Sequence, residues 1–496
     1  MIAAIPILLP FLAMILLLIT GNRLTLQKII ALGVSLLLVG TAIFLLISVH
    51  QDGLIIVFAG GWEAPFGISL VIDSFSAIMV LVTSLVALAM VIYAFRGLDE
   101  KRLRSRYFLF FFCMIMGING AFITGDIFNM YVWFEVMLMA SFILMVLGNE
   151  SKQLEGGLKY LTINLVGSLF FLAGIGILYG HAGTLNMAHL SLGFREIELP
   201  AAMNISLCLL LIAFAIKAAA FPFFFWLPSS YPTPPVAISA FFAGLLTKVG
   251  IYAMIRILTL LFNHYDQAWH GSLLTMAGFT MVIGGIAAFS QTDLRRILSF
   301  SIVSQMGYLI MGLGFFTKLG IASTLYFMIH NVLVKTNLFL LAGIVGKKQQ
   351  TFKLRWMGGW YSRYPGITML FFISAMAMAG FPPLSGFFGK FLLARAGFEA
   401  NHVLITGISI VMALVTIAYM FKIWNHVFWK EPDEKNMETP ARPVFLMILP
   451  SAILTLLILF LGLGAGNVLT LLQKTAGELL DPKGYVEGVL NYENGL

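Results

Sequence analysis

Six ionisable side chains interrupt apolar stretches of the sequence that are otherwise long enough to cross a membrane. One is Glu135, which alone among the 22 acidic residues lies well inside such a stretch. The others are basic: Lys217, Lys248, His330, Lys335 and Lys390. An ionisable group near the centre of a bilayer costs about 2.5–3.5 kcal/mol, so the glutamate and the four lysines together could cost on the order of 15 kcal/mol. That rivals the net stability of a typical fold, about 5–15 kcal/mol, and such a row is most simply explained as a path for protons.

Glu135 and Lys217 are the two groups of opposite charge in this row. Burial disfavours the charged form of either side chain, so both types can exchange protons near neutral pH. A nearby opposite charge reverses this effect by stabilising both ions. Approach or separation of the two side chains would therefore switch their affinity for protons, which is the coupling that a transporter needs. The alternative is a static ion pair with a structural role.

The remaining groups are expected to continue the path. Lys248 lies near the middle of the run 236–262, where Thr247 and the flanking glycines are expected to leave room for water. His330 is the one histidine of the eight that lies in the middle of an apolar run, and Lys335 follows it. Since histidine titrates near neutrality, we expect these two to form a central relay. The alternatives are a Lys248 that extends to an interface and a His330 that is only a hydrogen-bonded core residue.

The composition is that of a polytopic helical membrane protein. Hydrophobic residues make up 60% of the 496 residues and charged residues 10%, unlike soluble globular proteins. Runs of roughly 20 apolar residues predict an all-α fold with about fourteen transmembrane helices in a single membrane domain, residues 1–496. The predicted spans are 2–20, 27–49, 70–95, 106–124, 127–148, 157–181, 203–228, 236–262, 270–290, 295–316, 319–346, 366–397, 402–429 and 444–473.

The distribution of basic residues predicts the orientation of the chain. The formal net charge of +8 could suggest nucleic-acid binding, but the basic residues follow the loops instead. One set of alternate loops carries 19 of the 30 Lys and Arg residues, and the other set, with the C-terminal tail, carries only 5. Cytoplasmic loops are rich in Lys and Arg. We therefore expect the first set in the cytoplasm, both termini outside, a location in the cell (plasma) membrane and no nucleic-acid partner.

Two proline-containing breaks predict an internal repeat. Pro222 interrupts the seventh predicted span and Pro382 the twelfth, and proline removes a backbone hydrogen bond, so each helix should kink or unwind there. Because the breaks are five helices apart, helices 4–8 (residues 106–262) and 9–13 (residues 270–429) are expected to form two inverted repeats. Lys217 precedes the first break and Lys390 follows the second, which would place both on the outward halves of their helices. The alternative is two ordinary proline kinks.

Several conspicuous residues predict packing rather than chemistry. Cys113 and Cys208 lie far apart in apolar runs, so neither a metal site nor a cofactor is predicted. The glycine-rich segment 462–466 resembles a nucleotide loop only superficially. It lies in an apolar run with no preceding strand, and we expect it to serve helix packing.

Three charged residues near the ends of predicted helices are given structural roles. We expect Arg256 and Lys422 to extend their charged groups toward the membrane interfaces. Asp73, at the start of the third predicted span, is expected to cap a helix.

As a set, the motifs resemble those of a known family. They are Gly67-Ile-Ser-Leu-Val-Ile-Asp73, Asn129-Met-Tyr-Val-Trp-Phe-Glu135, Phe214-Ala-Ile-Lys217-Ala-Ala-Ala-Phe-Pro222, Gly244-Leu-Leu-Thr-Lys248-Val-Gly250, and Gly380-Phe-Pro-Pro-Leu-Ser-Gly386 followed by Lys390. With them the chain resembles the proton-translocating antiporter-like family shared by membrane subunits of respiratory complex I and by multisubunit Mrp-type cation/proton antiporters. It is most similar to members of the Mrp type.

The resemblance implies roles and partners. It implies that Glu135, Lys217, Lys248 and Lys390 transfer protons, with His330 and Lys335 beside them in one polar axis. It also implies a complex that exchanges sodium for protons and contains small hydrophobic subunits and a second large antiporter-like subunit. Related complex I subunits have glutamate at the position of Lys390, a departure that favours the Mrp type. No sodium route is visible in the sequence.

Two other functions remain open at this point. The chain could instead be a proton-pumping membrane subunit of an NADH or ferredoxin:quinone oxidoreductase, which would make it part of a redox-driven translocase. It could also be a self-contained solute carrier whose broken helices bind a small molecule. In each case the chain itself is expected to act as a transporter subunit without a catalytic site of its own.

Overall fold

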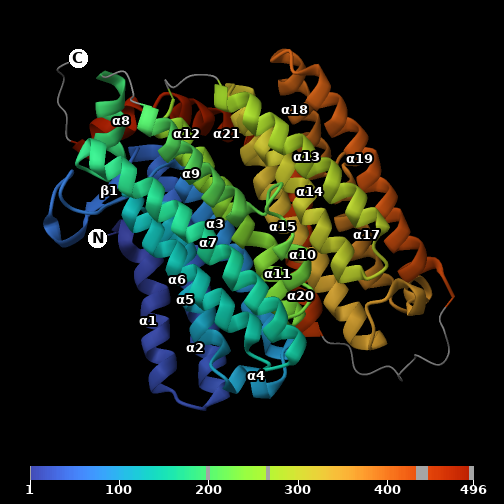
Figure 1. Cartoon of the computed structure of the whole chain (residues 1–496). Helices are drawn as coiled ribbons and strands as arrows, with labels where there is room; N and C mark the ends of the chain where they lie inside the picture. The colour runs from blue at the N-terminus through green and yellow to red at the C-terminus, as the bar shows by residue number, and fades with distance from the viewer. Residues whose placement is uncertain (1, 197–200, 264–267, 432–444, 491–496) are drawn as a thin grey trace.

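The computed structural model describes residues 2–196, 201–263, 268–431 and 445–490. Its helices lie side by side in one bundle, and a two-stranded sheet lies at one end of that bundle (Figure 1). The α-helices and strands are α1 Ile5–Ile19, α2 Leu24–Asp52, β1 Ile55–Phe58, β2 Ser69–Ile72, α3 Ser74–Gly97, α4 Glu100–Arg104, α5 Tyr107–Ile123, α6 Ile127–Val146, α7 Ser151–Ala182, α8 Met187–Glu196, α9 Ala201–Ala218, α10 Trp226–Ser230, α11 Val236–Phe241, α12 Thr247–Leu260, α13 Ala268–Ser290, α14 Leu294–Gly314, α15 Lys318–Gln349, α16 Trp360–Arg363, α17 Pro365–Ala379, α18 Ser385–Glu399, α19 Val403–Trp424, α20 Phe445–Leu463, α21 Ala465–Leu480 and α22 Lys483–Leu490. A π-helical turn, η3 (Phe242–Leu246), joins α11 to α12, and a second, η5 (Asn425–Trp429), follows α19.

The prediction of an all-α polytopic membrane protein is confirmed. In the described part of the chain, 12 helices are long and apolar enough to cross a membrane, and α5 and α17 are shorter apolar helices. The helices in the middle of the bundle are enclosed by protein. The segment from α11 to α12 and the long helices α14 and α15 are buried almost throughout, whereas α1 and α2 lie at the periphery. The interior helices are therefore those that can carry polar groups without exposing them to lipid.

Both predicted helix breaks are present. The seventh span ends as α9 at Ala218 and resumes as α10 at Trp226, with Ala219 at a φ of 53° between them. The twelfth span ends as α17 at Ala379 and resumes as α18 at Ser385, with Gly380 at a φ of 94°. Because an interrupted helix leaves its last carbonyl groups without partners, each break creates acceptors in the interior of the bundle.

Two predicted spans differ from the structure at their ends. The first residues of the span 70–95 form strand β2, which pairs in antiparallel fashion with β1. Asp73 then caps α3: its carboxylate accepts a hydrogen bond from the backbone of Ser76, whose hydroxyl accepts one from the backbone of Asp73. The capping prediction for Asp73 is thus confirmed, and the reciprocal cap explains why the helix begins only at Ser74.

The last predicted span, 444–473, is two helices, α20 and α21, which meet at Gly464. A Cβ atom on Gly462 would lie 2.7 Å from the carbonyl oxygen of Pro383 and 2.8 Å from the nitrogen of Ser385. The glycine-rich segment therefore allows α20 to pack against the break between α17 and α18, which confirms its predicted packing role.

The described ends of the chain meet at one end of the bundle. The first turn, Ile2–Ala4, contacts both strands, and α22 contacts α8. The basic helix α4 lies at the opposite end (Figure 1). Because the described part of the chain begins and ends at the same end of the bundle, it must run through the bundle an even number of times.

Candidate functional site

Glu135 and Lys217 are electrostatic neighbours without a direct ion pair. Glu135 is half-buried on α6, and its carboxylate accepts a short hydrogen bond from the hydroxyl of Ser168 on α7. Lys217 is buried in the last turn of α9, where it interacts with the charge of Glu135. Its Nζ has no hydrogen-bond partner among the described residues and lies 5.8 Å from the centre of the Phe134 ring. The two charged groups therefore influence each other without a hydrogen bond between them.

Lys248 is held by an irregularity in its own helix. It is fully buried in the first turn of α12, directly after the π-helical turn η3. Its Nζ donates a hydrogen bond of 2.7 Å to the carbonyl oxygen of Ala243, within that turn. A π-turn is wider than an α-turn and disturbs the regular pairing of carbonyl groups. The turn therefore supplies the acceptor that a buried ammonium group needs.

The glycines that flank Lys248 do not leave space for water, so that prediction is wrong. A Cβ atom on Gly250 would lie 2.8 Å from the nitrogen of Ala218 and 2.9 Å from the carbonyl oxygen of Phe214. The side chain of Thr336 occupies the equivalent space beside Gly244. The glycines instead let neighbouring helices approach closely, and at Gly250 this brings α12 against the end of α9 that carries Lys217.

His330 and Lys335 lie fully buried on the central helix α15. The Nδ1 atom of His330 lies 2.8 Å from the hydroxyl of Ser385, the first residue of α18, and its Nε2 atom has no partner in the described part of the chain. The Nζ atom of Lys335 donates a hydrogen bond of 2.5 Å to the hydroxyl of Ser301 on α14. Lys335 interacts electrostatically with both Lys248 and Lys390.

Lys390 reaches back across the second helix break. Its Nζ donates hydrogen bonds of 3.1 Å to the carbonyl oxygens of Met378 and Ala379, the last two residues of α17. It is half-buried on α18 and lies 5.7 Å from the centre of the Tyr308 ring. The break thus frees the carbonyl groups that bind the lysine. Lys217 also lies at the end of a half-helix, so both lysines are placed where the negative end of a helix dipole favours a positive charge.

The six predicted residues form a row made of two groups, each linked by electrostatic interactions. Electrostatic interactions link Glu135 to Lys217, Lys335 to Lys248 and Lys390, and His330 to Lys335 and Lys390. At Gly250 the backbone of α12 lies close to the end of α9 that carries Lys217, so the helices that carry the two groups are neighbours. Such a row can pass protons between groups because each member lies near another group that can accept or repel one.

Comparison with known proteins gives the family. The sequence profile described as "NADH:quinone oxidoreductase/Mrp antiporter, TM" matches residues 124–416, which is more than half of the chain. The chain belongs to this family. The match begins before Glu135 and ends after Lys390, so it includes the whole row of ionisable groups.

Relatives in the NADH:quinone oxidoreductase/Mrp antiporter family match nearly the full chain. The D subunit of the Na(+)/H(+) antiporter of Alkalihalophilus pseudofirmus is 42% identical over 489 residues, 98% of each chain. The protein of the same name from Bacillus subtilis is 39% identical over 487 residues, also 98% of each chain. A chain of the Mrp complex from Dietzia sp. superimposes with a TM-score of 0.92 at 28% identity, with 99% of each chain covered. A chain of the archaeal membrane-bound sulfane sulfur reductase superimposes with a TM-score of 0.90 at 27% identity, covering 98% of this chain and 99% of that one.

The structure also places a buried ion pair in this antiporter-family chain that the sequence interpretation missed. The guanidinium group of Arg256 on α12 donates hydrogen bonds of 2.6 and 2.9 Å to the two carboxylate oxygens of Asp73 and one of 2.9 Å to the hydroxyl of Tyr252. The prediction that Arg256 extends to an interface is wrong, because only 4% of its surface is exposed. Its spacing offered a signal: Lys248, Tyr252 and Arg256 lie four residues apart, on one face of a helix.

The other basic residue in that prediction, Lys422, binds backbone near the end of its helix. Its Nζ donates hydrogen bonds of 2.8 and 2.9 Å to the carbonyl oxygens of Phe289 and Gln291, at the end of α13. Its position relative to a membrane interface stays a prediction.

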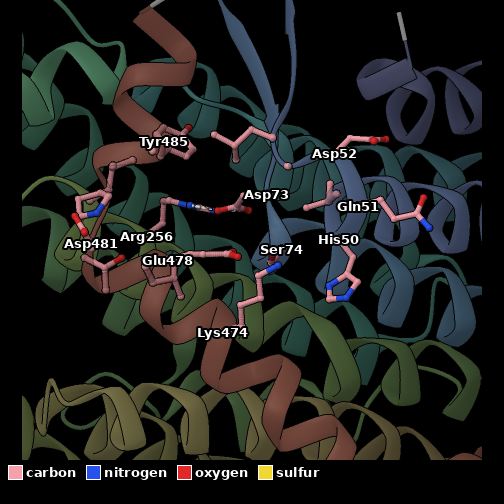
Figure 2. A pocket seen from close by; sticks show the side chains of 18 residues that line it. His50, Gln51, Asp52, Asp73, Ser74, Arg256, Lys474, Glu478, Asp481 and Tyr485 are labelled. Atoms are coloured by element: carbon pink, nitrogen blue, oxygen red, sulfur yellow. Dashed lines mark hydrogen bonds and ion pairs between the residues drawn. The ribbon is translucent and has the colours of Figure 1, made fainter. Parts of the chain in front are cut away.

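The Asp73–Arg256 pair forms part of the wall of a cavity of about 540 Å³ (Figure 2). The cavity lies between the end of α2, the start of α3, the last turns of α12 and the segment from α21 to α22. Its polar lining residues are His50, Gln51, Asp52, Asp73, Ser74, Arg256, Thr259, Lys474, Glu478, Asp481 and Tyr485.

We predict that Arg256→Met strongly destabilises the protein because it leaves the carboxylate of Asp73 buried without its partner. Breaking a buried ion pair in this way costs about 3–5 kcal/mol. The double variant Asp73→Asn with Arg256→Met should recover part of this loss, since it removes the unpaired charge. The measurement is the thermal transition of the purified protein or complex. A double variant that is no more stable than Arg256→Met would contradict the prediction.

Proposed function

We propose that this protein is a proton-translocating subunit of a multisubunit sodium/proton antiporter. The observation that carries the proposal is the row of six buried or half-buried ionisable groups on helices from α6 to α18. The identity of 42% over 98% of the chain to the D subunit of a Na(+)/H(+) antiporter supports the same assignment. Protons would move along the midplane from one of these groups to the next.

Electrostatic repulsion is the physical basis of the proposed transfer. Lys248, Lys335 and Lys390 are cationic when protonated and influence one another. Because like charges in a medium of low polarity repel strongly, a proton that arrives at one lysine lowers the affinity of its neighbours for their protons. A proton that binds at one end of the row therefore favours release farther along it. Glu135 and Lys217 would start or end this sequence by approaching or separating.

The partial exposure of the residues at the two ends of the row supports the presence of partner subunits. Glu135 and Lys390 are half-buried, whereas Lys248, His330 and Lys335 are fully enclosed. Glu135 lies between exposed apolar side chains of α6, Phe128 and Met139, each 46% exposed. An ionisable group on such a surface is costly in lipid. We infer that other membrane subunits cover these ends, and that one of them is a second large antiporter-like subunit.

Orientation and repeat structure are part of the same proposal. Helices 4–8 (residues 106–262) and 9–13 (residues 270–429) would form two inverted repeats, each with a broken fourth helix, and both termini would face the outside of the plasma membrane. The two breaks and the meeting of the described chain ends at one end of the bundle support this arrangement. The abundance of Lys and Arg in the loops at the other end supports the orientation.

A redox-driven translocase is the second candidate. The observation in its favour is the TM-score of 0.90 to a chain of an archaeal respiratory membrane complex. The higher identity to the D subunits of antiporters, and over the same share of the chain, favours the antiporter. The genes beside this one distinguish the two: small membrane subunits indicate an antiporter, and flavin or iron–sulfur subunits indicate a redox complex. A single purified chain that transports on its own would support the solute-carrier alternative.

The orientation predicts opposite accessibility of two exposed positions. In a chain in which Cys113 and Cys208 are replaced by alanine, Glu487→Cys in α22 should react with a membrane-impermeant thiol reagent added outside intact cells. Arg355→Cys should react only after the membrane is opened, because it lies in a loop assigned to the cytoplasm. Reaction of the cysteine at 487 from the cytoplasmic side alone would overturn the proposed topology and the inverted repeats with it.

The proton-transfer role predicts that Glu135→Gln and Lys217→Met each abolish exchange. Both substitutions nearly preserve side-chain length but remove a group that titrates, and losses of about 100-fold or more are typical when a proton-transferring group is removed. The readout is sodium-dependent pH change in everted vesicles, with assembly of the complex checked separately. Glu155→Ala is the matched control, since Glu155 is exposed and ion pairs at such exposed positions contribute little. Normal exchange in both variants would leave only a structural role for the pair.

The proposed role of Lys390 predicts that this position needs a side chain that can gain and lose a proton, and not merely a positive charge. A protonated glutamic acid has one O–H group, which can donate to one of the two carbonyl groups, of Met378 and Ala379, that now bind the lysine. Lys390→Glu should therefore retain measurable exchange with an altered pH optimum. Lys390→Met cannot titrate and Lys390→Arg cannot release its proton, so both should be inactive at matched expression. An active arginine variant would show that this position supplies only a fixed positive charge.

A further inference from the structure

The cavity beside Arg256 has the net negative charge expected of the entrance to a proton path. Its rim carries exposed charged side chains from α2 and from the segment α21–α22, and its wall carries Asp73 and Arg256 (Figure 2). The lining includes four carboxylates and two permanent cations, together with one histidine: Asp52, Asp73, Glu478 and Asp481; Arg256 and Lys474; His50. A cleft with net negative charge raises the local concentration of cations and protons.

The cavity opens at the end of the bundle where the described chain ends meet. Asp73 and Arg256 retain 7% and 4% of their surfaces exposed, so they close the inner wall while still facing the cavity. Behind them lies Tyr252, whose hydroxyl accepts a hydrogen bond from Arg256 and donates one of 2.5 Å to the carbonyl oxygen of Phe122 on α5. The ring of Tyr485 borders the guanidinium group at 5.5 Å.

Helix α12 connects this wall directly to the row of proton-transferring groups. Lys248 lies one turn before Tyr252, and side chains four residues apart on a helix lie on the same face with about 5–6 Å between their Cβ atoms. In this structure the ammonium group of Lys248 turns away from Tyr252 and binds the carbonyl oxygen of Ala243. Transfer between the two requires the flexible four-carbon side chain of Lys248 to rotate toward the tyrosine hydroxyl.

We propose that this cavity is the outer mouth of the proton path, that the Asp73–Arg256 pair is its gate, and that Tyr252 passes protons between cavity water and Lys248. The inference rests on the proposed function. When the guanidinium group of Arg256 moves away from Asp73, the gate opens and water from the cavity reaches Tyr252. A hydronium ion then gives its proton to the tyrosine oxygen while the original hydroxyl proton passes to neutral Lys248. Tyrosine ends unchanged, water is released and Lys248 becomes an ammonium ion.

The first test is Tyr252→Phe in the assembled complex. The substitution removes the hydroxyl group and keeps the ring, which packs against Phe75 with centroids 4.4 Å apart and against Phe122 at 4.6 Å. Exchange should fall by about 100-fold, the loss expected when a proton-transferring group is removed. Tyr326→Phe is the matched control, because the buried Tyr326 also donates to a backbone carbonyl, that of Leu461, but does not line the cavity. Its exchange should be unchanged.

The second test measures access from outside. In a chain in which Cys113 and Cys208 are replaced by alanine, Ser74→Cys places a thiol on the cavity wall and Asp481→Cys places one on the rim. A membrane-impermeant thiol reagent added outside should react at both positions, and its reaction at 74 should block the exchange that the untreated variant retains. Reaction at 481 without reaction at 74, or reaction at 74 without loss of exchange, would overturn the proposed mouth.

Lys248→Met separates failure of this inference from failure of the proposed function. If Lys248→Met is inactive and Tyr252→Phe exchanges at the normal rate, the path exists but does not pass through this cavity. If Lys248→Met itself exchanges normally, the row does not carry protons and the proposed function fails.

Discussion

The cost of placing ionisable groups inside a membrane protein determines much of this structure. Each buried ammonium group needs hydrogen-bond acceptors, yet a regular helix offers none because its carbonyl groups are already paired. The chain solves this with irregular helices. The π-helical turn before α12 provides the carbonyl group that binds Lys248, and the break after α17 provides two that bind Lys390. The two lysines thus depend on irregular backbone for their hydrogen-bond acceptors.

Incomplete pairing distinguishes the row from an ordinary ion-pair network. The Nζ atom of Lys217 and the Nε2 atom of His330 have no partner among the described residues, and Glu135 and Lys217 interact without direct contact. The pair of Arg256 and Asp73 is the opposite case, since both carboxylate oxygens accept hydrogen bonds from the guanidinium group. A fully paired charge is stable in one state, whereas an incompletely paired group can gain or lose a proton with little rearrangement. Incomplete pairing therefore suits the role in proton transfer that we propose for the row.

The degree to which each ionisable residue is enclosed by helices of its own chain also indicates where other proteins are needed. The helices that carry Lys248, His330 and Lys335 are surrounded by other helices of the same chain, so these residues need no partner to shield them from lipid. Glu135 and Lys390 lie on helices nearer the edges of the bundle and stay half-buried. A row of ionisable groups that is enclosed in the middle and half-buried at both ends is the arrangement expected of one unit in a larger membrane assembly.

The fold class and the two helix breaks could be predicted from the amino-acid sequence, and so could the buried or half-buried positions of the six ionisable residues. These features are encoded locally: apolar runs predict spans, proline predicts a break, and a charge inside an apolar run is conspicuous against its neighbours. Which charges meet depends on the packing of the helices. Arg256 looked like a residue at the end of a helix because its partner, Asp73, lies 183 positions away, and only the packing of α3 against α12 joins them. The glycines beside Lys248 could have left open space for water. Instead, α9 and α15 approach closely and their atoms occupy that space. Hydrogen bonds across helices depend on distances between segments remote in the chain, which no local pattern of residues contains.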